Sequence, residues 1–483
     1  MFHRLMILLL LFFCICLFAT THENTDIAQS ASADRVFPKV RGELHRGDYK
    51  QFIDEKRQRL QEEPQNSALR LDLARDELLS GNIEEARANL RLLLSDPQTE
   101  SEATWQTGLI HYLYGEYATA EKYFSALKQA APHYLKSKIG LLYVYYQTGQ
   151  YARARYLFTD EQRASLSQSN DALVSLMHAY GEDKPYRTEW YAEKAVLPFI
   201  SMNHLPIVSV RVNGYPINVF IDTGADLFVL KSDMATKLGL KPLASFTGTY
   251  AGGKTAEIGY SRLQALNLGD VTLHDVPVDI AEFPDSWVFT DETTGEKIEV
   301  NGILSTGVFR QFLTTLDYPQ RQLILNKRQG ERKSAAGITH SAATSIPFIL
   351  DGTHFLIVRG EINGKAGMTF FLDSGLDDPQ ASILLQQGAL DYAGIRLDRQ
   401  QSYIPDNSKG GLGGGGFEIT RLKIDSVALG PLKQRDLTGL YGVLPEVLYY
   451  TDSGILLDGF ISHQFLKHYK WTLDFDAMMM MFE

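Results

Sequence analysis

Two loops of the chain place an aspartate between an apolar run and a hydroxyl-glycine pair. Residues 220–224 read Phe-Ile-Asp-Thr-Gly, and residues 371–375 read Phe-Leu-Asp-Ser-Gly. Two carboxylates held a few ångströms apart cannot both ionise cheaply, so such a pair holds one proton between its members. The ionised member can take a proton from a bound water, while the protonated member donates a hydrogen bond to a developing oxyanion. Asp222 and Asp373 together would therefore direct water onto a carbonyl group.

The two loops belong to a longer internal duplication. An Asn-Gly pair at 213–214 precedes the first aspartate, and a second Asn-Gly pair at 363–364 precedes the other. Each pair predicts a hairpin turn into the strand that delivers the aspartate. A further segment of each unit matches its counterpart, namely Gly-Ile-Leu-Ser at 302–305 and Gly-Phe-Ile-Ser at 459–462. The separation of these two segments is nearly the same as that of the two aspartates. The pattern predicts two similar β units that each close with a matching segment. Both are expected to consist mostly of short strands separated by glycine, proline and aspartate turns.

The duplicated region, about residues 205–482, resembles the aspartic proteases of the retroviral type (retropepsin/pepsin-like). Residues 222–226 (Asp-Thr-Gly-Ala-Asp) match the catalytic loop of that family over five positions. Two such units make one enzyme in the family, and this chain resembles a fused form. The resemblance implies an all-β bilobal acid-protease-like domain, with lobe 1 at 195–330, an interlobe linker at 331–345 and lobe 2 at 346–483.

The resemblance also implies a role for each residue of the two loops. Asp222 and Asp373 are expected to form a catalytic dyad that hydrolyses peptide bonds with a shared water. The hydroxyls after the aspartates would bond the opposite loop, and the glycines would let the backbone approach the carboxylates closely. The residues expected to support the dyad are Thr223, Gly224, Ser374 and Gly375.

Three further residues are expected to bind substrate. Asp226 and Asp377 each lie four positions beyond a dyad aspartate, where the family's matching acid contacts substrate main chain. The alternative for both is a surface aspartate that forms a turn. Tyr250 lies in a glycine-broken hairpin and could cover a bound peptide as a flap. The glycine-dense segment 410–416 could be a second lid or a simple flexible connector.

The chain departs from the family behind both loops. Aspartic proteases commonly have glycine where this sequence has Ser305 and Ser462. The change is symmetric, so it is expected either to tighten the packing behind the loops or to alter the hydrogen bonding of the aspartates.

A different repeat precedes the β region. Gly81, Gly115 and Gly149 recur every 34 residues, which is the period of tetratricopeptide repeats. Each glycine would end a first helix in the left-handed conformation. Residues 50–185 therefore resemble a tetratricopeptide-like helical repeat domain, and stacked repeats of this kind present a concave surface. We expect this domain to hold a protein partner or the substrate protein. The fold class is multidomain, with all-α repeats followed by the all-β bilobal domain.

The N-terminus predicts export. Residues 5–19 form an apolar run that is short for a membrane span and suits a secretory signal. Cleavage is expected at Ala-Ser-Ala (31–33) or just after Ala19, and the alternative is an uncleaved anchor. Residues 1–33 are thus a signal peptide or an N-terminal anchor with a spacer. The protein would be periplasmic or secreted, and it would contact a membrane only if this segment is retained.

Composition narrows the function further. The net charge of −11 argues against nucleic-acid binding, because no basic surplus is available to neutralise phosphates. No histidine or cysteine spacing indicates a metal site, and we expect no cofactor. The leading hypothesis is an exported aspartic endopeptidase with a polypeptide substrate. The alternative is a catalytically inactive peptide-binding or scaffold protein built on the same fold.

Overall fold

The computed structural model describes most of the chain. The described residues are 45–250, 252–285, 287–328, 344–398, 402–403, 411–414, 418–442, 444 and 448–483. The predicted signal or anchor at 1–33 and positions 331–343 of the predicted linker lie outside them. Within these ranges, no helix combines the length and apolar character that a membrane crossing requires.

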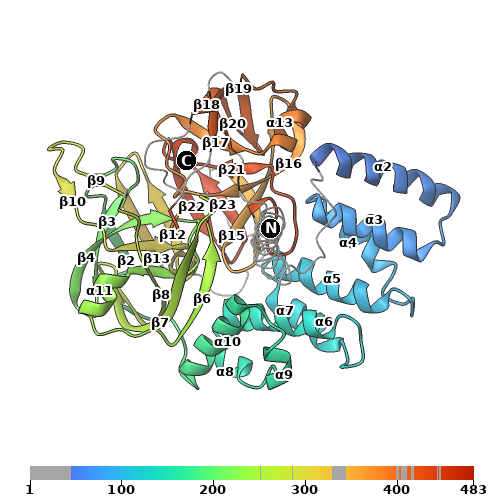
Figure 1. Cartoon of the computed structure of the whole chain (residues 1–483), viewed down its shortest axis with the longest axis horizontal. Helices are drawn as coiled ribbons and strands as arrows, with labels where there is room; N and C mark the ends of the chain where they lie inside the picture. Colours follow the sequence, from blue (N-terminus) through green and yellow to red (C-terminus); the bar gives the residue numbers. More distant parts are fainter. Residues whose placement is uncertain are drawn as a thin grey trace, which may run out of the picture.

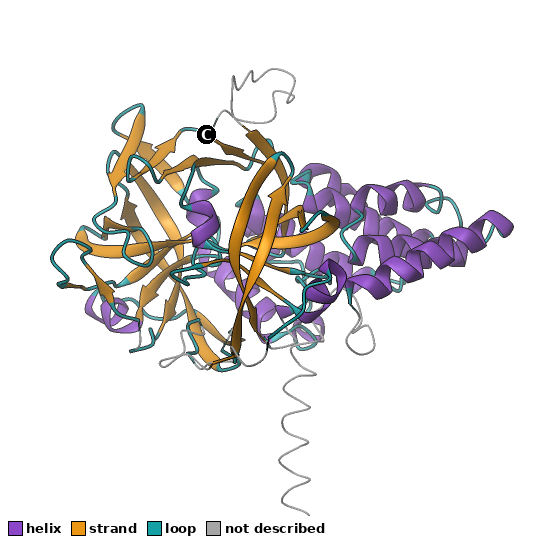
Figure 2. Cartoon of the chain, turned by 90° about the horizontal axis from the view of Figure 1, so that it is seen from above, coloured by secondary structure: helices purple, strands orange, loops and turns teal. Residues whose placement is uncertain are grey.

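The N-terminal part of the described chain consists of helix pairs, which are visible on one side of the molecule in Figures 1 and 2. Gly81, Gly115 and Gly149 make the turns within successive pairs, with φ values of 77°, 68° and 65°. The glycines that recur every 34 residues therefore form the turns between paired helices, in the left-handed conformation that glycine adopts readily. The helices are α2 (Arg46–Glu62), α3 (Ser67–Leu79), α4 (Ile83–Arg91), α5 (Glu100–Leu113), α6 (Tyr117–Ala126), α7 (Tyr134–Gln147), α8 (Tyr151–Ala154), α9 (Asp160–Arg163) and α10 (Gln168–Tyr180). Their identification as tetratricopeptide repeats stays a prediction.

Small residues let neighbouring helices approach closely. Phe124 of α6 lies between Gly108 of α5 and Gly140 of α7, and a Cβ atom on either glycine would come within 2.8 Å of the ring. The alanines at the repeating positions are fully buried: Ala86, Ala120 and Ala154. Larger side chains at these positions would force the helices apart.

The first lobe is a twisted β-sheet in the order β1-β8-β5-β11-β4-β3-β7-β6, and an additional β7–β8 pairing closes it on itself. Strand β11 runs parallel to β4 and places Ser305 opposite Asp222. The elements are β1 (Arg187–Trp190), β3 (Ile207–Val212), β4 (Tyr215–Asp222), β5 (Phe228–Lys231), α11 (Ser232–Lys237), β6 (Ala244–Thr249), β7 (Thr255–Asn267), β8 (Val271–Ala281), β9 (Phe289–Thr290), β10 (Lys297–Ile298), β11 (Gly302–Ser305) and α12 (Thr306–Phe309).

The second lobe repeats the arrangement. Strand β21 runs parallel to β16 and places Ile461 opposite Leu372, the residue before Asp373. The elements are β15 (Phe355–Ile362), β16 (Lys365–Leu372), β17 (Ala381–Leu385), α13 (Gln387–Ala393), β18 (Ser402–Tyr403), β19 (Ile419–Leu429), β20 (Leu432–Gly442), β21 (Gly459–Ile461) and α14 (His463–Leu466). In both units, the strand that leads into the Asp-Thr-Gly or Asp-Ser-Gly loop is thus supported by a parallel strand from the end of the same unit.

A shared run of strands joins the lobes. β12 pairs antiparallel with β22, and Thr315 lies opposite Thr472 with their hydroxyl oxygens 2.7 Å apart. These two residues occupy matching positions in the duplicated units, so the approximate twofold relation between the lobes passes close to this pair. The strands of this region are β2 (Lys194–Pro198), β12 (Leu313–Asp317), β13 (Gln322–Asn326), β14 (Thr344–Asp351), β22 (Lys470–Asp474) and β23 (Met479–Phe482).

The helical part packs directly on the lobes along the turn edge of its helix pairs. A Cβ atom on Gly81 would clash with the side chain of Thr369 in β16, and one on Gly115 would come within 3.0 Å of the sulfur of Met478. Buried side chains of the helices and of the second lobe form one continuous hydrophobic cluster. Gln147 at the end of α7 also donates to the carbonyl of Thr353 at 3.1 Å. The helices therefore share a core with the β domain.

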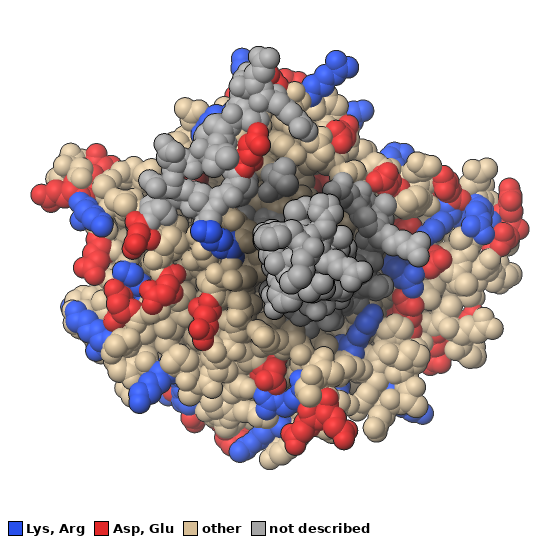
Figure 3. Space-filling view, in the orientation of Figure 1, with Lys and Arg blue, Asp and Glu red and all other residues tan. Residues whose placement is uncertain are grey.

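Charged side chains are spread over the surface. On the face seen in Figure 3, acidic and basic groups alternate over the lobes and over the helical edge. The visible described surface shows no broad patch of a single sign.

Candidate active site

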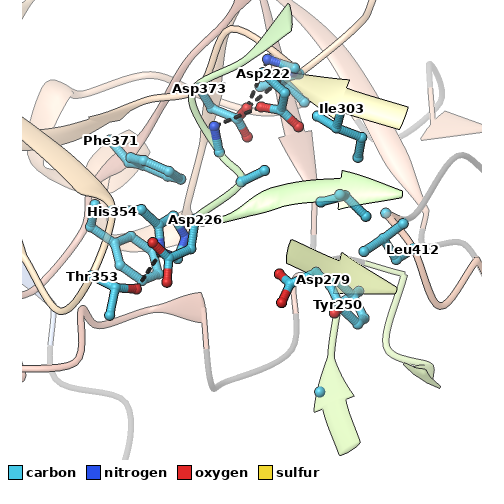
Figure 4. Close-up of a pocket in the computed structure, with 18 of the residues that line it drawn as sticks. Asp222, Asp226, Tyr250, Asp279, Ile303, Thr353, His354, Phe371, Asp373 and Leu412 are labelled. Carbon is cyan, nitrogen blue, oxygen red and sulfur yellow. Dashed lines mark hydrogen bonds between the residues drawn. The ribbon is translucent and has the colours of Figure 1, made fainter. Parts of the chain in front are cut away.

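The two sequence-predicted aspartates lie side by side at the seam between the lobes. Asp222 ends β4, and Asp373 directly follows β16. A Cβ atom on Gly224 would lie 2.8 Å from Oδ1 of Asp373 and 3.0 Å from Oδ1 of Asp222, so both carboxyls converge on this glycine. Figure 4 shows the two carboxyl groups facing each other at one end of a cavity.

Glycine is required on both loops. A Cβ atom on Gly375 would overlap the carboxyl carbon of Asp222, just as one on Gly224 would crowd Asp373. Each loop therefore leaves the space that the carboxylate of the other loop occupies. The backbone N–H of Gly224 donates to Oδ1 of Asp222 at 2.6 Å, and that of Gly375 donates to Oδ1 of Asp373 at 3.0 Å.

The hydroxyls of the two loops bond across the seam. The backbone N–H of Ser374 donates to Oγ1 of Thr223 at 2.9 Å, and the backbone N–H of Thr223 donates to Oγ of Ser374 at 2.9 Å. The Thr223 hydroxyl also donates to the carbonyl of Leu372 at 2.7 Å. Both side chains are buried, at 1% and 0% exposure. This crossed arrangement fixes the spacing of the dyad.

The dyad binds protons more tightly than ordinary aspartates. Burial raises the pKa of Asp222 to about 6, although hydrogen bonds from Gly224, Asp373 and Gly375 oppose the shift. Burial and the adjacent charge of Asp222 raise the pKa of Asp373 well above its usual range. The titrations are linked, since one charge makes the second ionisation costly. Over a range of pH, the pair therefore carries one proton and one negative charge.

The serines behind the loops differ in their contacts. Ser462 donates its hydroxyl to the carbonyl of Ala381 at 2.6 Å. The hydroxyl of Ser305 is buried and has no hydrogen-bond partner among the described residues. Serine stands at both positions where the resembled family commonly has glycine. Only the hydroxyl of Ser462 makes a hydrogen bond among the described residues.

The dyad opens into a cavity of about 530 Å³ between the lobes. Apolar side chains line it on both sides of the dyad. Those of the first lobe include Leu205, Phe220, Val229, Trp287, Phe289 and Ile303, and those of the second include Phe355, Phe371, Leu376 and Phe460. An extended chain with apolar side chains on alternating sides fits such a lining.

Tyr250 lies at the tip of the β6–β7 hairpin and lines the same cavity. Its backbone N–H donates to the carbonyl of Lys254 at 3.0 Å, which closes the hairpin tip. The described part of the glycine-rich segment, residues 411–414, packs on this tip: a Cβ atom on Gly411 would lie 3.1 Å from Cβ of Tyr250. The hairpin of one lobe and the glycine segment of the other thus meet over the cavity.

Comparison with known proteins agrees with this geometry. Residues 208–308 match the family model of aspartyl proteases. An aspartic protease domain therefore occupies this part of the chain, and it contains Asp222, the hairpin with Tyr250 and strand β11. No curated protein matches the sequence.

Two solved structures illustrate what the chain is similar to. A retropepsin-like aspartic protease from Rickettsia conorii is 18% identical, with a TM-score of 0.19, and the match covers 29% of this chain and 94% of that one. The aspartic proteinase from Irpex lacteus is 13% identical, with a TM-score of 0.36, and the match covers 60% of this chain and 96% of that one.

The two acids predicted to bind substrate both line this cavity. Asp226 accepts a hydrogen bond at 2.9 Å from the hydroxyl of Tyr146, which lies on helix α7. Asp377 lies 3.0 Å from Nδ1 of His204, a residue of the first lobe. Each acid is therefore held by an element outside its own loop.

Sequence reasoning missed two features of the site. Asp279 of β8 lines the cavity, and so do Tyr143, Asn170 and Leu173 of the helical part. An acid between Val278 and Ile280 in an apolar strand was a usable signal, because such a position faces either solvent or a polar site. No local pattern indicated that helices would reach the cavity, since that depends on how the helical part packs on the lobes.

Among the residues that the structure describes, no group of three or more histidine, cysteine, aspartate or glutamate side chains is arranged to hold a metal ion.

Proposed function

We propose that this protein is an exported aspartic endopeptidase that hydrolyses peptide bonds with a water molecule activated between Asp222 and Asp373. The observation that carries the proposal is the convergence of both carboxyls on Gly224, with crossed hydrogen bonds between their loops. The family match at residues 208–308 supports a peptidase in general.

The reaction requires the singly protonated dyad. The ionised carboxylate accepts a proton from water as that water attacks the scissile carbonyl. The protonated carboxyl donates a hydrogen bond to the oxygen as negative charge develops there. The tetrahedral intermediate then collapses, and the leaving nitrogen takes up a proton held by the dyad. The raised pKa values of both groups favour this state near neutral pH.

The substrate is an extended polypeptide held between the dyad and the hairpin that carries Tyr250. The apolar side chains beside the dyad, such as Phe220, Ile303 and Phe371, favour apolar residues on either side of the scissile bond. The hairpin tip excludes water from the reacting groups.

The helical domain recruits a protein partner or the substrate protein in this proposal. Support comes from its position, because α7 and α10 reach the cavity that holds the dyad. Export through the segment at residues 5–19 would place the enzyme in the periplasm or outside the cell.

Cleavage of a peptide mixture by the purified full chain tests the proposal. We expect cleavage that pepstatin inhibits and that Asp222→Asn abolishes. The matched control Asp270→Asn removes an acid from an exposed turn and should leave cleavage unchanged. If no peptide is cut at any pH while Asp222→Asn alters peptide binding, the protein is instead a binding or scaffold protein.

A further inference from the structure

A third acid, outside the dyad, faces the cavity beneath the Tyr250 hairpin. Asp279 lies on β8, and Figure 4 shows its carboxyl beside Tyr250, across the open space from Asp226. The two acids are close enough for the charge of Asp226 to act on Asp279. Its Oδ1 atom is buried and has no hydrogen-bond partner among the described residues. A carboxyl removed from water without a partner is costly, so its retention at this position calls for a partner that the described chain does not provide.

The cavity around Asp279 is lined by several acids and by two histidines, His204 and His354. His204 lies 3.0 Å from Asp377, and burial lowers the pKa of His354. Burial and the negative charge of Asp226 raise the pKa of Asp279 well above its usual range. The described residues that line the cavity include no lysine or arginine. Its acids are Asp222, Asp226, Asp279, Asp373, Asp377 and Asp452.

The nearby cation Arg310 does not neutralise Asp279 from the cavity. The side chain of Arg310 is buried, and its guanidinium carbon lies 5.3 Å from the ring centre of Tyr146. Arg310 is not among the described residues that line the cavity. Its charge interacts with that of Asp226, but no described lysine or arginine reaches Asp279 from the cavity.

A second polar group without a partner comes from the helical part. Asn170 of α10 lines the cavity and is 2% exposed, yet its Nδ2 atom has no hydrogen-bond partner among the described residues. Helix α10 also packs on β6, the first strand of the hairpin. The wall of the cavity at this end therefore offers an amide donor for a carbonyl oxygen and a carboxyl for a cation, which matches a peptide residue with a positive charge.

We propose that Asp279 and Asp226, with Asn170 of the helical wall, form a subsite that selects a cationic group of the substrate, either a lysine or arginine side chain or the α-ammonium of the peptide. This inference rests on the proposed protease function and defines its substrate class as basic peptides. Asp279 is the specificity-determining residue, because it lines the cavity and one oxygen of its carboxyl has no partner among the described residues. Asn170 binds main chain.

Binding to the full chain carrying Asp222→Asn tests the subsite without cleavage. The probes are fluorescent peptides with two phenylalanines at the centre and one lysine moved through each remaining position. Norleucine at the same position is the uncharged match, and each peptide is made with a free and an acetylated N-terminus. Fluorescence anisotropy gives the Kd of each peptide.

We expect one lysine position, or the free N-terminus, to bind at least about tenfold more tightly than its neutral match. A single preferred lysine position identifies a side chain as the ligand, whereas a difference only between free and acetylated peptides identifies the α-ammonium. The double variant Asp222→Asn/Asp279→Asn should bind the charged peptide and its neutral match equally. Asp222→Asn/Asp270→Asn removes the same charge from an exposed turn and should keep it, which excludes a general effect of net charge. Asn170→Leu should weaken charged and neutral peptides alike.

The inference is overturned if lysine and norleucine peptides bind equally at every position and with both N-termini, or if the preference survives Asp279→Asn. Turnover of the same peptides by the unmodified chain separates this result from the proposed function. If the protein prefers charged peptides but cleaves none, the proposed protease function is wrong and the subsite is supported. If it cleaves peptides without a charge preference, the protease function is supported and the subsite is wrong.

Discussion

The hydroxyl of Tyr146 on helix α7 donates a hydrogen bond to Asp226, four residues beyond the first dyad aspartate, at 2.9 Å. Tyr146 is 1% exposed, and the guanidinium of Arg310 lies over its ring. The helical part is therefore connected to the loop that carries Asp222 by a buried polar contact. Through this contact the helices help to hold the wall of the candidate active site.

Tyr146→Phe should lower the free energy of unfolding by about 1–2 kcal/mol, because Asp226 loses a buried donor. It should also raise KM for peptides, since Asp226 lines the cavity. Tyr151→Phe is the matched control: Tyr151 stacks on Tyr146, and its buried hydroxyl has no partner among the described residues. Removing that hydroxyl should leave stability equal or slightly higher. Thermal unfolding and peptide kinetics measure both effects, and equal losses in the two variants would contradict the assigned role.

The activity should follow the protonation of the dyad. Below about pH 6 both carboxyls are protonated and no base is available, since the pKa of Asp222 is raised to about 6. Activity should rise as the pH passes this value and fall again when Asp373, whose pKa is also raised, loses the second proton. The pH profile of kcat/KM checks this. If kcat/KM instead rises at the pH where ordinary aspartates ionise, burial does not raise the pKa of Asp222.

Removing either member of the dyad should abolish turnover. Asp373→Asn leaves the pair without its second carboxyl, and we expect kcat to fall by about 10³-fold or more. Peptide binding should persist, because the cavity lining is unchanged. Retention of substantial activity in Asp373→Asn would show that hydrolysis does not use the pair.

Local sequence patterns predicted the elements well but not how they assemble. The hairpin turn predicted at the Asn-Gly pair 213–214 joins β3 and β4, because an Asn-Gly turn between alternating residues determines a hairpin locally. The glycine spacing likewise located the helix turns. The reach of Asn170 into the cavity and the contact of Tyr146 with Asp226 depend on docking between distant segments. No periodicity encodes such contacts, so they became visible only in the folded chain.

Thr223 should be sensitive to loss of its hydroxyl. Thr223→Ala removes both the acceptor for the Ser374 N–H and the donor to the Leu372 carbonyl, and it leaves these two groups buried without a partner. We expect lower stability and lower kcat, because the spacing of the dyad loosens. Thr223→Ser keeps the hydroxyl and should restore most of both quantities. If Thr223→Ala matched Thr223→Ser in kcat, the crossed hydrogen bonds would not be needed to position the dyad.

Asp279→Asn should stabilise the protein near neutral pH. The pKa of Asp279 is higher in the folded state than its ordinary value of 3.8 because burial and Asp226 disfavour the charge. The folded state therefore binds this proton more tightly, and the resulting stabilisation is complete below the unfolded pKa and lost as pH rises through the folded pKa. Asparagine cannot ionise, so Tm of the variant should exceed that of the parent at pH 7. The difference should shrink as pH falls towards the ordinary value of 3.8 and should be absent below it. A lower Tm at pH 7 would contradict this account.

The buried pair of Arg46 and Asp458 should control the docking of the first helices. Nε of Arg46 on α2 donates to both carboxylate oxygens of Asp458 in the second lobe, at 3.2 and 3.1 Å, and the two side chains are 5% and 1% exposed. Asp458 also accepts the backbone N–H of Thr369 at 2.8 Å. Arg46→Ala leaves this carboxylate buried and uncompensated, which should cost about 3–5 kcal/mol.

Lys50→Ala on the same helix is the control for Arg46→Ala. It removes only an exposed ion pair with Asp54, and it should change stability little because solvent screens that pair. Hydrogen exchange should show the loss of protection in Arg46→Ala beginning in α2 and α3, since this ion pair joins α2 to the second lobe. Global unfolding with no early change in α2 would mean that the helical part and the lobes unfold as one unit, as expected if their shared hydrophobic core outweighs the ion pair.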